Sequence, residues 1–128
     1  MKRPRREDPR LARLSTICLS LPDAQREVHG SHARFSVRTR TFAYFLNGHH
    51  GDGIVSVACK VERADMPAFL ERDATRFYVP DYIGPRGWIA LCLDVKPVDW
   101  KEVASLVRDS YCRVAPANLT ARVANAGK

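Results

Sequence analysis

The sequence lacks any apolar run near the roughly 20 residues that a membrane-spanning helix needs. It also lacks a secretory signal, although a basic start precedes the apolar stretch 11–21. Glu7 and Asp8 interrupt the basic part, Arg13 interrupts the apolar part, and no small-x-small cleavage site follows. We therefore expect a cytoplasmic protein with no membrane partner.

Paired cysteines and metal-ligand spacings are also lacking. The four cysteines are far apart, form no C-x-x-C pair and lie in apolar patterns: Cys18, Cys59, Cys92 and Cys112. They are expected to be small buried residues in a reducing compartment, without disulfides or zinc. His29-x-x-His32 lies in a polar connection, and His49-His50 with Asp52 lies in a glycine-rich hairpin without a third ligand. Solvated loop histidines are the preferred interpretation, so no metal or cofactor is predicted.

Catalytic signatures are missing as well. The sequence has no G-x-S-x-G element and no recognisable cysteine nucleophile. Gly84-Pro85-Arg86-Gly87 lacks the glycine frame and the Lys-Ser/Thr of a phosphate loop. No catalytic residue can be named, and we expect a protein that is not an enzyme; a shifted titratable group lining a pocket would favour the opposite.

Positive charge is in excess and is concentrated at the start of the chain. The net charge is +7, and residues 1–13 hold six Lys or Arg against two acids. A pI near 9.6 is compatible with a polyanionic partner but does not require one.

The remaining pattern predicts one α+β domain of two layers. At 128 residues the chain is of single-domain length. Helical periodicity runs from Asp8-Pro9 to Pro22, around Asp65–Asp73, and from Asp99 to Pro116. Strand patterns lie around Phe35 and Val37 and over 41–46, 54–61 and 88–93, and the first three should form an antiparallel meander. We expect a mainly antiparallel sheet with helices on one face and the other face exposed. The expected boundaries are a basic flexible leader (1–8), the domain (9–116) and a frayed tail (117–128), with a polar connection over 23–31.

The stretch Pro80–Trp88 is the most distinctive segment of the sequence. Two prolines, two glycines and two aromatic residues within nine positions exclude a helix or a central strand. The segment is predicted to be a rigid loop leading into the strand that begins at Trp88. Trp88 and Trp100 are interpreted as packing residues in preference to ligand-stacking residues.

The candidate binding residues are on the polar face of the meander and on this loop. Arg34 and Arg38, with Arg40 as a further candidate, could lie near Lys60, and the loop would present Tyr82 and Arg86. Arg and Lys position phosphates, and aromatic rings stack on bases. The alternative is that these charges simply solvate an exposed sheet face. The binding interpretation requires Arg34, Arg38, Lys60 and Arg86 to share one face.

Several segments together resemble the MmcQ/YjbR family of small bacterial proteins. The resemblance covers about residues 10–119 and is carried by Leu19-Ser-Leu-Pro22, Phe35-Ser-Val-Arg-Thr-Arg-Thr-Phe-Ala43, Val57-Ala-Cys-Lys60, Tyr82-Ile-Gly-Pro-Arg-Gly-Trp88, Val98-Asp-Trp100, Ser110-Tyr111 and Val114-Ala-Pro116. It implies a frataxin-like (CyaY-like) two-layer sandwich and DNA binding, and it supplies no catalytic residues.

Two functions from different classes follow from these observations. The first is non-enzymatic DNA binding through phosphate contacts by Arg34, Arg38, Lys60 and Arg86, with Tyr82 available for stacking. The second is a protein-interaction or small-ligand module that uses the same loop and sheet face. Iron binding by analogy with frataxin is disfavoured, because iron needs clustered carboxylates and the first helix carries Arg10 and Arg13.

Overall fold

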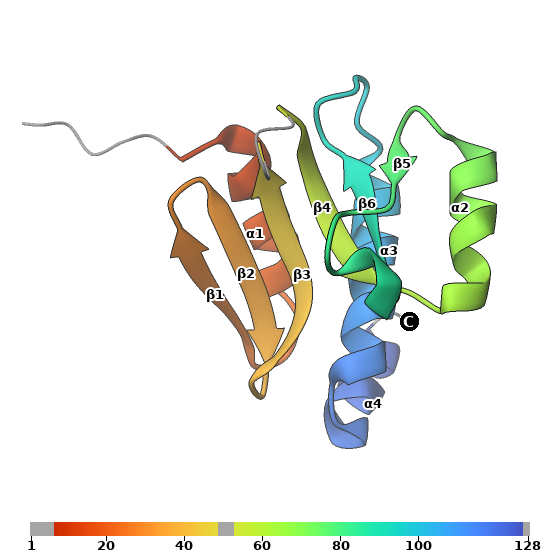
Figure 1. Cartoon of the computed structure of the whole chain (residues 1–128). Helices are drawn as coiled ribbons and strands as arrows, with labels where there is room; N and C mark the ends of the chain where they lie inside the picture. Colours follow the sequence, from red (N-terminus) through yellow and green to blue (C-terminus); the bar gives the residue numbers. More distant parts are fainter. Residues whose placement is uncertain (1–6, 49–52, 127–128) are drawn as a thin grey trace, which may run out of the picture.

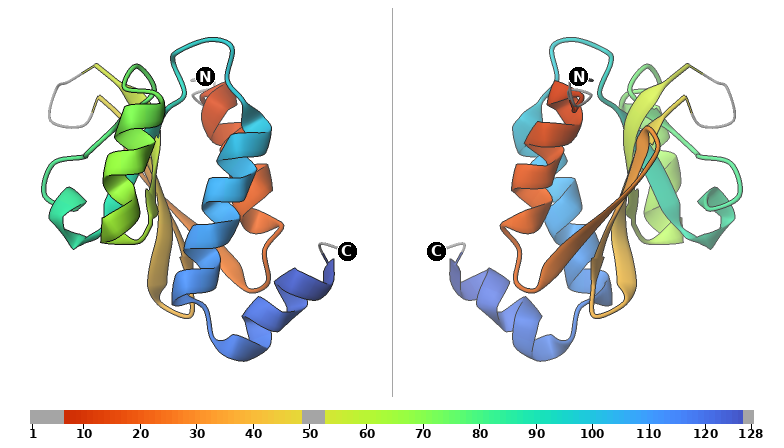
Figure 2. Two further views of the ribbon diagram at one scale, coloured as in Figure 1. Left: turned by 90° about the vertical axis from the view of Figure 1, so that its right-hand side faces the viewer. Right: turned by 90° about the vertical axis from the view of Figure 1, so that its left-hand side faces the viewer.

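The fold is a two-layer α+β sandwich, as predicted. The computed structural model describes residues 7–48 and 53–126. Its strands form one six-stranded antiparallel sheet in the order β1-β2-β3-β4-β6-β5, and α1 and α3 pack on one face (Figures 1 and 2). The elements are α1 (Pro9–Leu19), β1 (Ala24–His29), β2 (His32–Val37), β3 (Arg40–Asn47), β4 (Val55–Lys60), the 3-10 turn η2 (Arg63–Asp65), α2 (Met66–Arg72), β5 (Phe77–Tyr78), the 3-10 turn η3 (Gly84–Arg86), β6 (Trp88–Cys92), α3 (Trp100–Val114) and α4 (Ala117–Ala126).

Both main helices begin where the sequence predicts. The Asp8 carboxylate accepts a hydrogen bond from the backbone N–H of Arg10 at 2.8 Å, and proline occupies the first helical position. The Asp99 carboxylate accepts from the backbone N–H groups of Lys101 and Glu102, both at 3.1 Å. Local capping chemistry therefore sets where α1 and α3 start.

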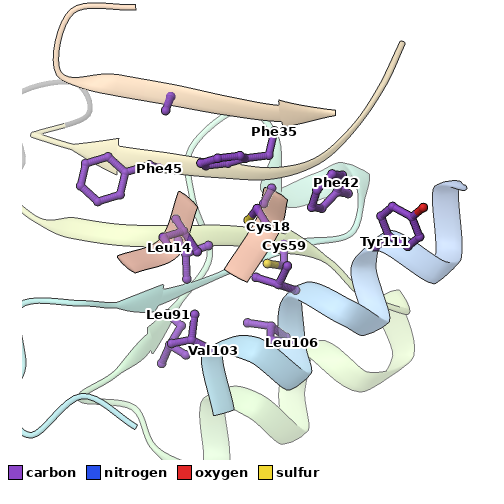
Figure 3. Packing of buried hydrophobic residues seen from close by; sticks show 14 of the residues in the cluster. Leu14, Cys18, Phe35, Phe42, Phe45, Cys59, Leu91, Val103, Leu106 and Tyr111 are labelled. Atoms are coloured by element: carbon purple, nitrogen blue, oxygen red, sulfur yellow. The ribbon is translucent and has the colours of Figure 1, made fainter. Parts of the chain in front are cut away.

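The main core lies between the sheet and these two helices (Figure 3). Phe35 and Phe45 project from the sheet onto Leu14 of α1, and all three are fully buried. Phe42 meets Tyr111 of α3 edge to face, with ring centroids 5.3 Å apart. This contact fixes the last turns of α3 against the start of β3.

The opposite face of the sheet is not wholly exposed, so that expectation was wrong. Leu46, Ala58, Trp88 and Ala90 form a second, smaller buried cluster there. Ile83, from the loop between β5 and β6, packs against this cluster. The Pro80–Trp88 segment thus folds over one end of the outer face instead of only leading into β6.

Three segments differ from the sequence-based expectation. The polar connection 23–31 contains the edge strand β1, whose side chains are almost all exposed and so show no apolar alternation. Residues 77 and 78, for which the sequence predicted no strand, form the two-residue strand β5. The tail expected to fray after Pro116 forms α4, with Leu119 and Val123 buried.

Candidate nucleic-acid interface

Gly87 brings Lys60 and Arg86 together. Lys60 ends β4 opposite Trp88, and the N–H of Val61 donates to the carbonyl of Gly87 at 2.8 Å. Gly87 has φ of 95°, and a Cβ there would lie 3.1 Å from the Val61 carbonyl oxygen. Glycine tolerates the positive φ and has no Cβ to obstruct the close approach to Val61. Arg86, the preceding residue, therefore lies directly beside the end of β4.

Four cations surround one hollow at this point. Its volume is ≈ 480 Å³, and it is lined by Lys60, Val61, Glu62, Arg63, Ala64, Arg86 and Arg113. Arg113 comes from the last turn of α3 and donates a hydrogen bond to the Glu62 carboxylate. Side chains from β4, η2, η3 and α3 thus meet at the same place.

A second hollow adjoins the first and shares Arg113 with it. It measures ≈ 300 Å³ and is lined by Arg38, Arg40, Arg113, Val114, Ala115 and Pro116. Arg38 and Thr39 form the tight β2–β3 turn, with φ of 48° and 70°. The turn places Arg38 3.2 Å or less from the Asp23 carboxylate, to which its Nε and Nη2 donate.

We call the six cations of the two hollows the basic groove: Arg38, Arg40, Lys60, Arg63, Arg86 and Arg113. Two carboxylates, Asp23 and Glu62, neutralise part of this charge through ion pairs with Arg38 and Arg113. Within residues 7–48 and 53–126, the other four cations form no ion pair. The groove therefore keeps a net positive charge that an anion could neutralise.

The groove lies at one end of the molecule. The β2–β3 turn and the start of α4 lie beside the C-terminal end of α3 (Figures 1 and 2), and Lys60 and Arg86 join Arg113 in lining the first hollow. Lys101, at the other end of α3, is twelve residues from Arg113, which corresponds to about 18 Å along the helix.

The predicted site residues are only partly brought together. Lys60 and Arg86 line one hollow, and Arg38 lines the neighbouring one. Arg34 lies in the middle of β2, opposite Tyr44 on the outer face, with its Nη2 3.5 Å from the Glu27 carboxylate. It is four residues from Arg38, about 13 Å along an extended strand. Arg34 therefore lines neither hollow, whereas the other three predicted cations each line one of them.

Tyr82 is held outward on the loop before η3. Its side chain is 76% exposed and its backbone has φ of 67°. Tyr82 is not among the lining residues of either hollow of the groove.

Arg63 and Arg113 belong to the groove and were not identified from the sequence. Arg113 occupies the polar side of the predicted long helix, where a charged residue normally has no special role. Arg63 follows β4 in a segment without periodicity. Only the tertiary packing of α3 against β4 shows that these residues meet Lys60 and Arg86.

The histidines and cysteines are placed as follows. His32 lies in β2 and accepts a hydrogen bond at Nδ1 from the Asn47 N–H, at 3.2 Å. His49, His50 and Asp52 lie outside the described residues. Among the residues that are described, no group of three His, Cys, Asp or Glu could hold a metal ion.

Cys18 and Cys59 are buried, and burial raises the pKa of both thiols, whereas Cys112 is exposed, contrary to expectation.

A separate hollow lies between α1 and β1. It measures ≈ 440 Å³, has apolar walls from Leu11, Val28 and Phe45, and carries Glu7 and Asp8 at its edge. None of the residues predicted to bind a ligand contributes to it.

No helix in the described part of the chain is long and apolar enough to span a membrane. No curated protein matches the sequence. A solved structure, that of Deinococcus radiodurans protein DR2400 with a DUF419 domain, is similar with a TM-score of 0.68 at 17% identity. The match covers 88% of this chain and 85% of that protein, and it shows that the two share a fold. The family model YjbR matches residues 19–113, most of the described domain, and the chain therefore belongs to the YjbR family.

Proposed function

We propose that this protein is a non-enzymatic DNA-binding domain that contacts phosphates through the basic groove. One observation carries the proposal: Lys60, Arg63, Arg86 and Arg113 come from four different elements and line a single hollow. Cations that merely solvate a surface have no reason to converge in this way.

The chemistry of these side chains suits anion binding. Guanidinium and ammonium groups are hydrogen-bond donors without an acceptor, so they favour binding an anion over removing a proton. Arginine in particular can present two parallel N–H groups to phosphate oxygens. Arg38, Lys60 and Arg86 are retained from the sequence-based set, Arg40, Arg63 and Arg113 are added, and Arg34 and Tyr82 lie outside the groove.

Contacts to phosphates discriminate only weakly between different DNA sequences. Half or more of the hydrogen bonds in protein–DNA complexes go to phosphates and sugars, and these contacts position the protein without reading bases. Binding through the groove should therefore be electrostatic, dependent on salt and weakly selective for sequence.

The test is a titration of labelled DNA, followed by fluorescence anisotropy, at several salt concentrations. The wild-type chain is expected to bind at low salt and to lose affinity steeply as salt rises. The Lys60→Ala, Arg86→Ala double variant should bind more weakly, and each lost phosphate contact should reduce the slope of log K against log salt by about 0.9.

The matched control removes two cations away from the groove. Lys96 and Lys101 are exposed and lie before and at the start of α3, so Lys96→Ala, Lys101→Ala lowers the net charge equally. It should leave most of the affinity intact. Equal losses in the two double variants, or no binding at low salt, would exclude the groove as a DNA site.

A small-ligand module is the second candidate, and the hollow between α1 and β1 favours it. Its ≈ 440 Å³ lies within the range of small-molecule pockets, and Leu11, Val28 and Phe45 give it an apolar wall, whereas both acids at its edge are already paired, Glu7 with Arg26 and Asp8 with Arg10. A thermal-shift screen of small apolar molecules would test it, with Val28→Asp expected to abolish any stabilisation because the variant places a carboxylate in the apolar wall. Stabilisation that persists in the variant would place the ligand elsewhere.

A further inference from the structure

We infer that the basic groove contains two phosphate subsites that share Arg113, so that its ligand is a chain with at least two phosphates. The inference rests on the proposed DNA-binding function and specifies that neighbouring phosphates of one ligand bind in different hollows of the groove. It follows from the way the end of α3 separates β3 from β4.

Ser110 of α3 lies between the adjacent ends of β3 and β4. Its hydroxyl donates to the Phe42 carbonyl of β3 at 2.6 Å and accepts from the Lys60 N–H of β4 at 2.9 Å. The pairing of β3 with β4 is regular from Asn47↔Val55 to Ala43↔Cys59. Beyond that point a side chain of α3 takes the place of a direct bond between the strands.

Arg113 follows Ser110 by three residues, and residues three apart share a side of a helix. Arg113 therefore emerges beside the separated strand ends and lines both hollows. On one side are Lys60, Arg63 and Arg86. On the other are Arg38 and Arg40, carried by the β2–β3 turn. Separation of the strands thus divides the cations into two sets.

Each hollow has the donors for one phosphate. The first offers Lys60, Arg63 and Arg86, which form no ion pair with any described residue. The second offers Arg40, likewise without an ion pair among the described residues, and Arg38, which also contacts Asp23. Arg113 has further N–H groups beyond the one given to Glu62 and can serve either side. A single phosphate would fill one hollow, and a phosphodiester chain would fill both.

The experiment measures competition by short oligonucleotides that carry one, two, three or more phosphates against a labelled strand on the full chain. Wild-type affinity should rise about tenfold when the competitor can reach the second hollow, a gain typical of an added charge-assisted contact. Arg40→Ala should remove most of this gain and should weaken the one-phosphate competitor much less than the longer competitors.

Variants of the first hollow provide the converse test. Lys60→Ala, Arg86→Ala should weaken the one-phosphate competitor about tenfold or more, because its preferred hollow loses two cations. Arg113→Ala should weaken every competitor. Its effect should not add to those of the other variants, because coupled residues share the same contact. Circular dichroism and thermal melting establish that each variant folds.

The outcomes separate the inference from the proposed function. If Arg40→Ala leaves the gain intact while Lys60→Ala, Arg86→Ala weakens all competitors, DNA binding stands and the two-subsite arrangement is wrong. A competitor with two phosphates that binds no better than one with a single phosphate overturns it equally. If neither set of variants weakens any competitor, the groove is not the binding site and both proposals fall.

Discussion

Ser110 replaces a missing contact between two strands. It is fully buried, and its hydroxyl satisfies one backbone donor of β4 and one backbone acceptor of β3. A buried polar group without a partner is costly, so a hydroxyl here stabilises the protein more than its small size suggests.

The variant Ser110→Ala should therefore lower the free energy of unfolding by about 1–3 kcal/mol, because the Lys60 N–H and the Phe42 carbonyl both lose their partner. Urea denaturation measures the change. Ser105→Ala, at an exposed position of the same helix, is the matched control and should change stability little. Similar small losses for both variants would show that water replaces the hydroxyl.

Residue-scale prediction from the sequence succeeded where the interaction is local. Asp8 and Asp99 cap helices two or three residues away, and the sequence shows both partners at once. Ser110 acts on residues 50 and 68 positions away, and Arg113 meets Glu62 across 51 positions. No local pattern distinguishes these two residues from their helical neighbours.

Whether a helix or strand could be predicted from the sequence also depended on whether its cause is local or tertiary. β2 alternates apolar and polar residues because one of its faces lies on the core, whereas β3, β4 and β6 have buried residues on both faces, and β6 contains no polar residue. β1 is an edge strand with exposed side chains, so its pairing with β2 leaves no apolar signal. α4 rests on the domain through a few buried residues, too few for a clear period over ten positions.

Leu119 should hold α4 in place. It is 2% exposed and belongs to the main core. Leu119→Ala should cost about 2–5 kcal/mol, the usual range for emptying a buried leucine site. Asn118→Ala, at the exposed neighbouring position, should have little effect. Thermal melting of both variants checks this, and equal melting temperatures would mean that α4 contributes nothing to the stability of the domain.

The loop between β5 and β6 depends on the close approach of Gly84 to Val79. A Cβ at Gly84 would lie 2.3 Å from the Val79 Cγ1 atom, closer than two carbons can approach. Gly84→Ala should therefore destabilise the protein by about 1–3 kcal/mol through overpacking. Val79 is 43% exposed, and its truncation alone should be mild.

The double variant Gly84→Ala, Val79→Ala tests whether the contact with Val79 causes this loss of stability. Removing Cγ1 leaves space for the new methyl group, so the double variant should recover most of the lost stability. Strictly additive losses in urea denaturation would show that the contact with Val79 is not the reason why position 84 requires glycine.

At the scale of the whole molecule, the distribution of charge is what the sequence could not provide. The α+β sandwich and its core followed from the order and periodicity of the elements. Arg38, Lys60 and Arg86 line the two adjoining hollows, whereas Arg34, in the middle of β2, lines neither. Sequence gives the number of cations, but the twist of the sheet and the docking of α3 decide which ones meet.

Glu62 is the acidic residue that lines the first hollow of the basic groove, and it should oppose phosphate binding. Its carboxylate lines the first hollow and holds Arg113, so it both repels a phosphate and competes for the same guanidinium. The side chain is 65% exposed, which keeps the effect modest. Glu62→Gln should raise oligonucleotide affinity about two- to fivefold at low salt, and the gain should shrink at high salt. Glu71→Gln, exposed on α2, changes the net charge equally and serves as the control. Lower affinity in Glu62→Gln would mean that the carboxylate acts mainly by positioning Arg113 for the ligand.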